Sequence, residues 1–225
     1  MIFGLRSWKT YKVLKNAYSK MFAELGIGIA LAMYFYGVTP LLFPDNRAYL
    51  GLAYLIALIP LVLGLNQSSR ASLKALGFDS LEASMKYIVP SVLIIFFVLH
   101  FQHPPLPAIY ENGIISWGVP FPFQYVFAVL VTPLALLTGI FLFTAKTISR
   151  KAFVKKTLFS ITFFLGGLGG GLGVVLFTSY TMLLIFYIAM FIGFAFLGTM
   201  ILVDIFMKEE ASGNDEKTQI FTSKP

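Results

Sequence analysis

The chain has 225 residues, of which 58% are hydrophobic and only 12% are charged, and its formal net charge is +7. A typical soluble domain is about 45–50% apolar and about 25% charged. These proportions, together with a mean hydropathy of +0.83, exclude an ordinary water-soluble domain. The sequence contains no cysteine, which excludes disulfides, thiolate catalysis and cysteine-ligated metal centres.

The N-terminal segment, residues 1–20, is basic and amphipathic. Four apolar residues recur over residues 5–21 at helical spacing and share one face: Tyr11, Leu14, Tyr18 and Met21. This pattern predicts either a short helix on an anionic inner leaflet or the basic flank of a first membrane span. The apolar run that follows is too long for a signal peptide and has no small-residue cleavage site, so we expect it to be retained.

Six apolar segments are long enough to cross a membrane, because a spanning helix needs about 20 apolar residues for about 30 Å of hydrocarbon. Their approximate ranges are 21–43, 48–65, 85–101, 121–143, 158–178 and 182–206. They predict an all-α, polytopic transmembrane bundle over residues 21–207. We expect the polar tail, residues 208–225, to be disordered.

The basic residues follow an alternating pattern along these six segments. All 17 except Arg47 fall in connections that six spans place on one side of the membrane. Lysine and arginine accumulate on the cytoplasmic side, so the pattern predicts a cell-membrane protein with both termini cytoplasmic. The net charge is then explained without a nucleic-acid partner, and the expected partners are membrane lipids and further protein subunits.

The connection between the second and third segments, residues 66–86, begins with polar residues. It is predicted to be a cytoplasmic loop in which Asn66 and Gln67 end the second span. Asp79 or Ser80 is then expected to cap the third span, since such side chains accept hydrogen bonds from free N–H groups. Prolines lie inside three of the predicted spans and are expected to kink them: Pro60, Pro90 and Pro133.

Both histidines of the chain lie at the outer end of the third segment. His100 and His103 are three residues apart, and Glu111 follows in a proline-rich external connection. Imidazole and carboxylate groups can bind zinc or copper, so three interpretations are open. The group is a metal site, a pH-sensitive element, or a set of ordinary polar residues at the interface.

Two acidic residues lie near the inner ends of the first and last segments. Glu24 follows Lys20 by four residues, and Asp204 precedes Lys208 by four. This spacing predicts local ion pairs, and the alternative is a proton or cation site. No acidic residue falls in the middle of a predicted span, which counts against an ordinary proton-coupled carrier.

The fifth segment carries a run of glycines: Gly166, Gly167, Gly169, Gly170, Gly171 and Gly173. With Gly193 in the sixth segment, they provide the small residues that let transmembrane helices approach closely. Tight helix packing is the first interpretation, and a hinge or a groove for a lipid or substrate is the second.

No nucleotide-binding, dinucleotide-binding or serine-hydrolase motif is present, and the sequence indicates no cofactor and no clustered catalytic set. The leading hypothesis is a permease-type or accessory membrane subunit of a larger complex, with the basic stretch 145–156 docking a cytoplasmic partner. A non-catalytic membrane scaffold or sensor is the second hypothesis. An intramembrane enzyme or carrier acting on a lipid-linked substrate is the third, so enzymatic activity is left open.

Overall fold

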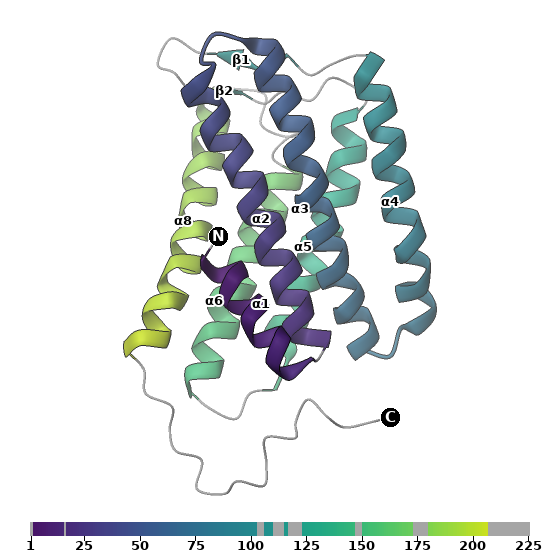
Figure 1. Ribbon diagram of the computed structural model, residues 1–225, viewed down its shortest axis with the longest axis vertical. Helices are drawn as coiled ribbons and strands as arrows, with labels where there is room; N and C mark the ends of the chain where they lie inside the picture. The colour runs from purple at the N-terminus through teal and green to yellow at the C-terminus, as the bar shows by residue number, and fades with distance from the viewer. Residues whose placement is uncertain are drawn as a thin grey trace, which may run out of the picture.

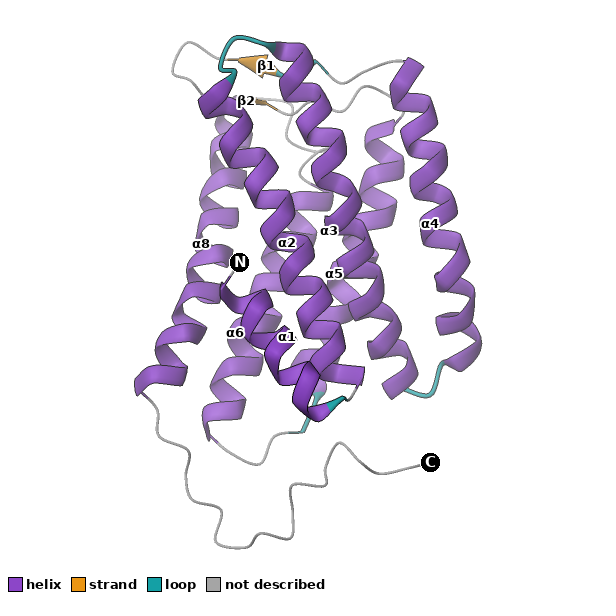
Figure 2. Ribbon diagram, viewed as in Figure 1, coloured by secondary structure: helices purple, strands orange, loops and turns teal. Residues whose placement is uncertain are grey.

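The structure is a computed structural model that describes residues 2–15, 17–102, 106–109, 115–116, 123–146, 150–172 and 180–206. This part of the chain is nearly all helical (Figures 1 and 2). The α-helices are α1 (Ile2–Leu14), α2 (Ala17–Leu42), α3 (Arg47–Ala75), α4 (Asp79–Gln102), α5 (Phe123–Thr144), α6 (Arg150–Gly166) and α8 (Tyr180–Phe206). A π-helix, η1 (Gly167–Leu172), continues α6. Two short strands, β1 (Ala108–Ile109) and β2 (Ile115–Ser116), pair antiparallel at one end of the bundle.

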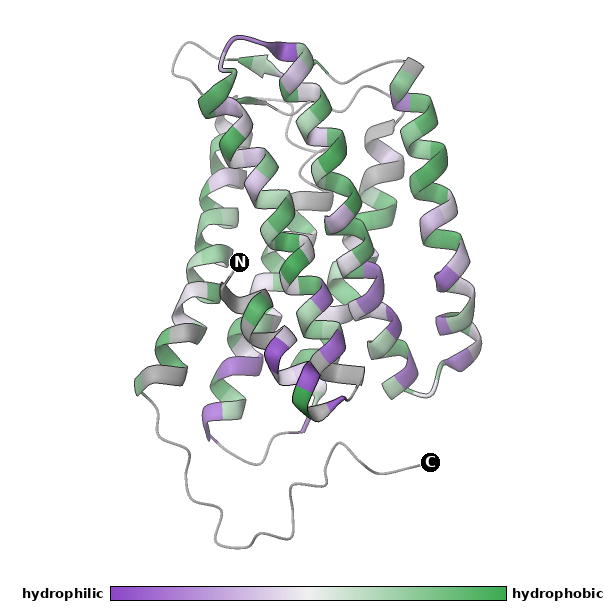
Figure 3. Cartoon of the chain, viewed as in Figure 1, coloured by the Kyte–Doolittle hydropathy of each residue, from purple (hydrophilic) through white to green (hydrophobic). Residues whose placement is uncertain are grey.

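Four helices in the described residues are long and apolar enough to cross a membrane: Lys20–Leu42, Arg47–Ala75, Asp79–Phe101 and Arg150–Gly169. Two shorter apolar stretches lie in α5 and α8, at Ala128–Thr144 and Tyr187–Met200. Hydrophobic residues cover most of the upper and middle parts of the helices. Hydrophilic residues gather toward the lower end and in the connection between α2 and α3 at the top (Figure 3). The prediction of an all-helical, strongly apolar protein is confirmed.

One of the two alternatives for the N-terminal segment was a short helix over residues 5–21. The structure has a short helix there, but it ends at Leu14 because the chain turns after this residue. Lys15 adopts a positive φ of 52° and its N–H donates to the Tyr11 carbonyl at 2.8 Å. The helix therefore ends at this turn, and α2 begins at Ala17. α1 packs against α2 along its lower part (Figure 1). Met21 is a buried residue of α2 and does not belong to the apolar face of α1.

The predicted loop over residues 66–86 is also wrong, because α3 continues ten residues past the end of its apolar run. It stops at Gly77, whose positive φ of 82° suits a residue without a side chain. The Phe78 N–H donates to the Leu73 carbonyl at 2.9 Å, and the Gly77 N–H donates to the Lys74 carbonyl at 3.1 Å. These two bonds form a Schellman motif. α4 begins at once with Asp79, close to the predicted start. The Glu82 N–H donates to the Phe78 carbonyl at 3.0 Å, so Phe78 occupies the N-cap position in place of the predicted Asp79 or Ser80.

The basic stretch that was predicted as a loop, residues 145–156, lies largely in α6, which begins at Arg150. Lys156 donates from Nζ to the carbonyl oxygens of Phe143 at 3.1 Å and Ala145 at 2.5 Å. These carbonyls lie at the C-terminal end of α5, where a cation is favourable. Lys156 therefore binds carbonyl oxygens of this chain, at the end of a neighbouring helix.

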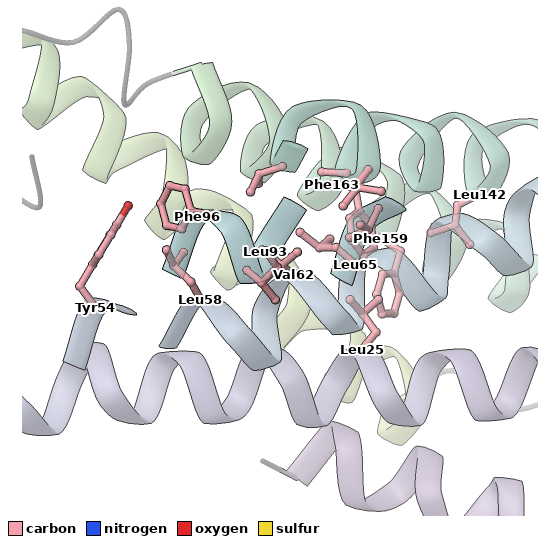
Figure 4. Packing of buried hydrophobic residues seen from close by; sticks show 14 of the residues in the cluster. Leu25, Tyr54, Leu58, Val62, Leu65, Leu93, Phe96, Leu142, Phe159 and Phe163 are labelled. Carbon is pink, nitrogen blue, oxygen red and sulfur yellow. The ribbon is translucent and has the colours of Figure 1, made fainter. Parts of the chain in front are cut away.

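α3 is the central helix, since it packs against α2, α4 and α5. The buried apolar side chains around it form one cluster, shown in Figure 4, which includes Leu25, Leu58, Val62, Phe96 and Phe159. α4 lies at an edge of the bundle (Figure 1) and, in the described residues, packs mainly on α3 with few contacts to α5. In the described residues, α3 consequently lies between two helices, α4 and α5, that scarcely contact each other.

Candidate functional site

The first of the two acidic candidates, Glu24, forms an ion pair with Lys20 at 3.6 Å, and the two side chains are 33% and 44% exposed. An exposed pair at this spacing contributes about 0.3–0.5 kcal/mol. Asp204 belongs to α8, but its side chain and Lys208 lie outside the described residues. Among the described residues, Glu24 belongs to no group of three His, Asp or Glu side chains that could hold a metal ion.

His100 is buried near the end of α4. Its Nδ1–H donates to the Phe96 carbonyl at 2.9 Å, and its ring lies 3.9 Å from the Phe96 ring, centroid to centroid. His103 and Glu111 lie outside the described residues. Within the described ranges, no group of three His, Asp or Glu side chains could hold a metal ion.

The glycines of the fifth and sixth segments differ in their surroundings. A Cβ added to Gly167 would lie 2.8 Å from the Ala135 Cβ of α5, whereas one added to Gly166 would meet no described atom within 4 Å. A Cβ on Gly193 would lie 3.6 Å from the Leu165 Cβ, which is an ordinary contact. Three further candidates, Gly169, Gly170 and Gly171, lie in η1; Gly173 lies outside the described residues.

Three of the bonds between helices join a hydroxyl to the carbonyl of a glycine. Ser160 donates to Gly139 at 2.7 Å, Thr132 to Gly167 at 3.2 Å, and Thr162 to Gly193 at 3.0 Å. A glycine has no side chain to cover its carbonyl, so a neighbouring helix can reach that oxygen. These bonds connect α5 with α6, α5 with η1 and α6 with α8.

A buried hydroxyl cluster, defined here as Ser68, Ser69 and Ser72 of α3 and Thr138 of α5, lies beside these contacts. The Ser68 and Thr138 hydroxyls are 2.9 Å apart, and those of Ser69 and Thr138 are 3.3 Å apart. Ser69 also donates to the Leu134 carbonyl at 2.7 Å. Ser72 donates to the Ser68 carbonyl at 2.8 Å. The cluster satisfies its own hydroxyl groups and fastens α3 to α5.

On the other side of α3, Arg70 joins this helix to α4. Its terminal nitrogens contact the Glu82 carboxylate at 2.5 Å and the Gln67 side-chain oxygen at 3.1 Å. The Arg70 and Glu82 side chains are only 22% and 20% exposed. Nearby Asn66 is 5% exposed. Two buried atoms, Asn66 Oδ1 and Arg70 Nε, have no hydrogen-bond partner among the described residues. Arg70 lies on the side of α3 that contacts α4, and Asn66, four residues earlier, lies on the same side of the helix.

Sequence reasoning assigned Asn66 and Gln67 to a helix terminus and passed over the serines. A signal was present, however, because Ser68 and Ser72 follow each other at a helical spacing and no helix-breaking residue occurs before Gly77. The described hydroxyls of the cluster bond to carbonyls and to one another, so they lack the adjacent base that activates a nucleophile. The arrangement can hold helices together and can offer polar atoms to a ligand.

The fold and this site define an apolar, helical protein that has four helices long and apolar enough to cross a membrane among its described residues, with polar groups enclosed between its helices. Comparison with known proteins adds no relative: no family model matches the chain, and no curated protein or solved structure is detectably similar to it.

Proposed function

We propose that the chain is a six-span protein of the cell membrane with both termini in the cytoplasm. The four long apolar helices and the two shorter apolar stretches of α5 and α8 support six spans. The confinement of basic residues other than Arg47 to helix ends and connections on one side of the proposed spans supports the orientation.

The absence of cysteine from the sequence makes this topology simple to test. Asp45→Cys lies in the proposed outer connection and Lys74→Cys at the proposed inner end of α3. A membrane-impermeant maleimide should label Asp45→Cys in intact cells and Lys74→Cys only after the cells are permeabilised. Labelling in the reverse order would overturn the orientation, and equal labelling of both in intact cells would overturn the span count.

Within this topology, we propose that the protein is a permease-type or accessory membrane subunit of a larger complex. The observation that carries this proposal is the position of α4, which the described residues pack along one face only. Its packed face contains Val89, Leu93 and Phe96. Its remaining surface is apolar and exposed, and includes Tyr87, Ile88, Ile94, Ile95, Val98 and Phe101. Because transmembrane helices gain stability from close packing with one another, this surface suits a helix of another subunit.

A photo-crosslinking residue at position 95 tests the subunit proposal. The control is position 129 of α5, which is also occupied by an exposed apolar residue, Val129. We expect position 95 to capture one protein that also co-purifies stoichiometrically in native lipids, and position 129 to capture only lipid. Lipid adducts alone at both positions, with no stoichiometric partner, would contradict the proposal.

A second candidate function, a carrier for a lipid-linked substrate, is favoured by the buried polar atoms of Asn66 and Arg70. Enclosed polar groups in a membrane bundle are suited to a polar headgroup that must cross the bilayer. The test is transbilayer movement of a fluorescent phospholipid in vesicles containing the purified protein. Movement that exceeds protein-free vesicles and falls in Asn66→Leu supports a carrier, whereas movement at the protein-free rate argues against it.

A further inference from the structure

The side of α3 that faces α4 holds one buried acceptor and one buried donor that the described residues leave unused. Asn66 Oδ1 can accept a hydrogen bond and Arg70 Nε–H can donate one, and neither has a partner there. Residues four apart lie on one helix face, with Cβ atoms about 5–6 Å apart. A single small group between them could therefore contact both atoms.

The surroundings of Arg70 limit the chemistry of that group. The guanidinium is held in place by Gln67 at 3.1 Å and by the Glu82 carboxylate at 2.5 Å. Glu82 already balances the positive charge, so the position does not require an anion. Among the buried atoms, one acceptor and one donor are unused, and an alcohol hydroxyl complements both because it donates and accepts at once.

The neighbouring hydroxyl side chains do not supply this group. Ser68 and Ser69 bond toward α5 through Thr138 and the Leu134 carbonyl, and Ser72 bonds to the Ser68 carbonyl of its own helix. None of these three hydroxyls is therefore hydrogen-bonded to Asn66 Oδ1 or Arg70 Nε. Hydrophilic residues gather in the lower parts of α3 and α4, where these two helices are joined (Figure 3). A polar group entering from that end would pass other polar residues.

We propose that the Asn66–Arg70 site, the α4-facing side of α3 between these two residues, binds an alcohol hydroxyl of a polyol. The hydroxyl donates to Asn66 Oδ1 and accepts from Arg70 Nε–H. Two sources share this chemistry: the glycerol or sugar headgroup of a membrane lipid, and a free polyol. The inference concerns a ligand of the single chain and does not depend on assembly with other subunits.

The test measures the thermal stability of the delipidated protein with defined additions. The probes are phosphatidylglycerol, whose headgroup carries hydroxyls, and phosphatidylmethanol, which has the same charge and no hydroxyl. Free glycerol is the third probe. We expect phosphatidylglycerol to raise the melting temperature more than phosphatidylmethanol does, and native mass spectrometry to detect one retained phosphatidylglycerol per chain.

Asn66→Leu is the informative variant, because leucine has a similar size and removes the unused acceptor. It should fold, lose the difference between the two lipids, and retain at least tenfold less phosphatidylglycerol. Ser84→Ala is the matched control, since the Ser84 hydroxyl is exposed on α4 and bonds only to the Ser80 carbonyl of its own helix. This control should behave as the parent protein does.

The outcomes distinguish a lipid headgroup, a free polyol and a bridging water molecule. Stabilisation by phosphatidylglycerol that is lost in Asn66→Leu supports a lipid headgroup. Stabilisation by glycerol alone, again lost in Asn66→Leu, supports a free polyol. If the parent protein does not distinguish the two lipids and glycerol affects the parent and Asn66→Leu equally, only water bridges the two atoms and the proposal is overturned.

Discussion

Gly28 of α2 and Pro60 of α3 meet backbone to backbone: a Cβ at residue 28 would overlap the Pro60 carbonyl oxygen. One turn further along α3, a Cβ on Gly64 would lie 3.2 Å from the Leu25 Cα. The two helices therefore cross on glycine surfaces, and their contact is the most extensive in the bundle. Small residues allow such close approach in membranes.

Gly28→Ala should destabilise the protein by about 1–3 kcal/mol, because an added methyl group in a closely packed contact forces the helices apart. Gly37→Ala in the same helix is the control, since a Cβ there would meet no described atom within 4 Å. Unfolding in mixed micelles with increasing denaturing detergent measures both variants. Equal stability of the two variants would show that the crossing is looser than the structure indicates.

Gly167→Ala should be less stable than Gly166→Ala, because only residue 167 lies at a close contact between helices. The first places a methyl group 2.8 Å from the Ala135 Cβ and should lower the free energy of unfolding by about 1–3 kcal/mol. The second should leave it unchanged or raise it by up to about 1 kcal/mol, because alanine favours the helix over glycine. Adding Ala135→Gly should recover part of the loss in Gly167→Ala. If it recovers none, strain in the π-helix is responsible for the loss.

The bond between Ser68 and Thr138 can be measured with a double-mutant cycle of Ser68→Ala and Thr138→Val. We expect a coupling energy of about 0.6 kcal/mol, the average for hydrogen bonds between membrane helices. Thr138 also contacts Ser69 at 3.3 Å, so Thr138→Val alone should destabilise more than Ser68→Ala. Additive effects of the two substitutions would mean that the hydroxyls contribute no net energy to each other.

Glu82→Gln should destabilise the packing of α4 on α3 by about 1–2 kcal/mol, between the values for exposed and fully buried ion pairs. The reason is that Arg70 keeps its charge in a largely enclosed position. Glu24→Gln removes the partly exposed pair with Lys20 and should change stability by less than about 0.5 kcal/mol. Unfolding of both variants at low and high salt provides the comparison. A larger loss of stability in Glu24→Gln than in Glu82→Gln would contradict the expectation that the more enclosed ion pair matters more.

Local sequence patterns were sufficient for some elements and misleading for others. The start of α4 could be predicted because Gly77 permits the positive φ that ends α3, and Asp79 follows at once. The end of α3 could not, because the run Asn66-Gln67-Ser68-Ser69 is polar and was taken for a loop. Both serines also bond to α5, at the Thr138 hydroxyl and the Leu134 carbonyl. These partners are about 70 residues away in the sequence, so no local pattern indicates them.

The sequence by itself determined that the chain is helical and apolar, because hydrophobic runs of this length leave backbone groups no partners other than those within a helix. Only the tertiary structure decided which glycines lie at close contacts, which carbonyls the hydroxyls reach, and which polar atoms of Asn66 and Arg70 are left over. Those properties depend on the neighbouring helix, and a linear pattern carries no information about which helix that is.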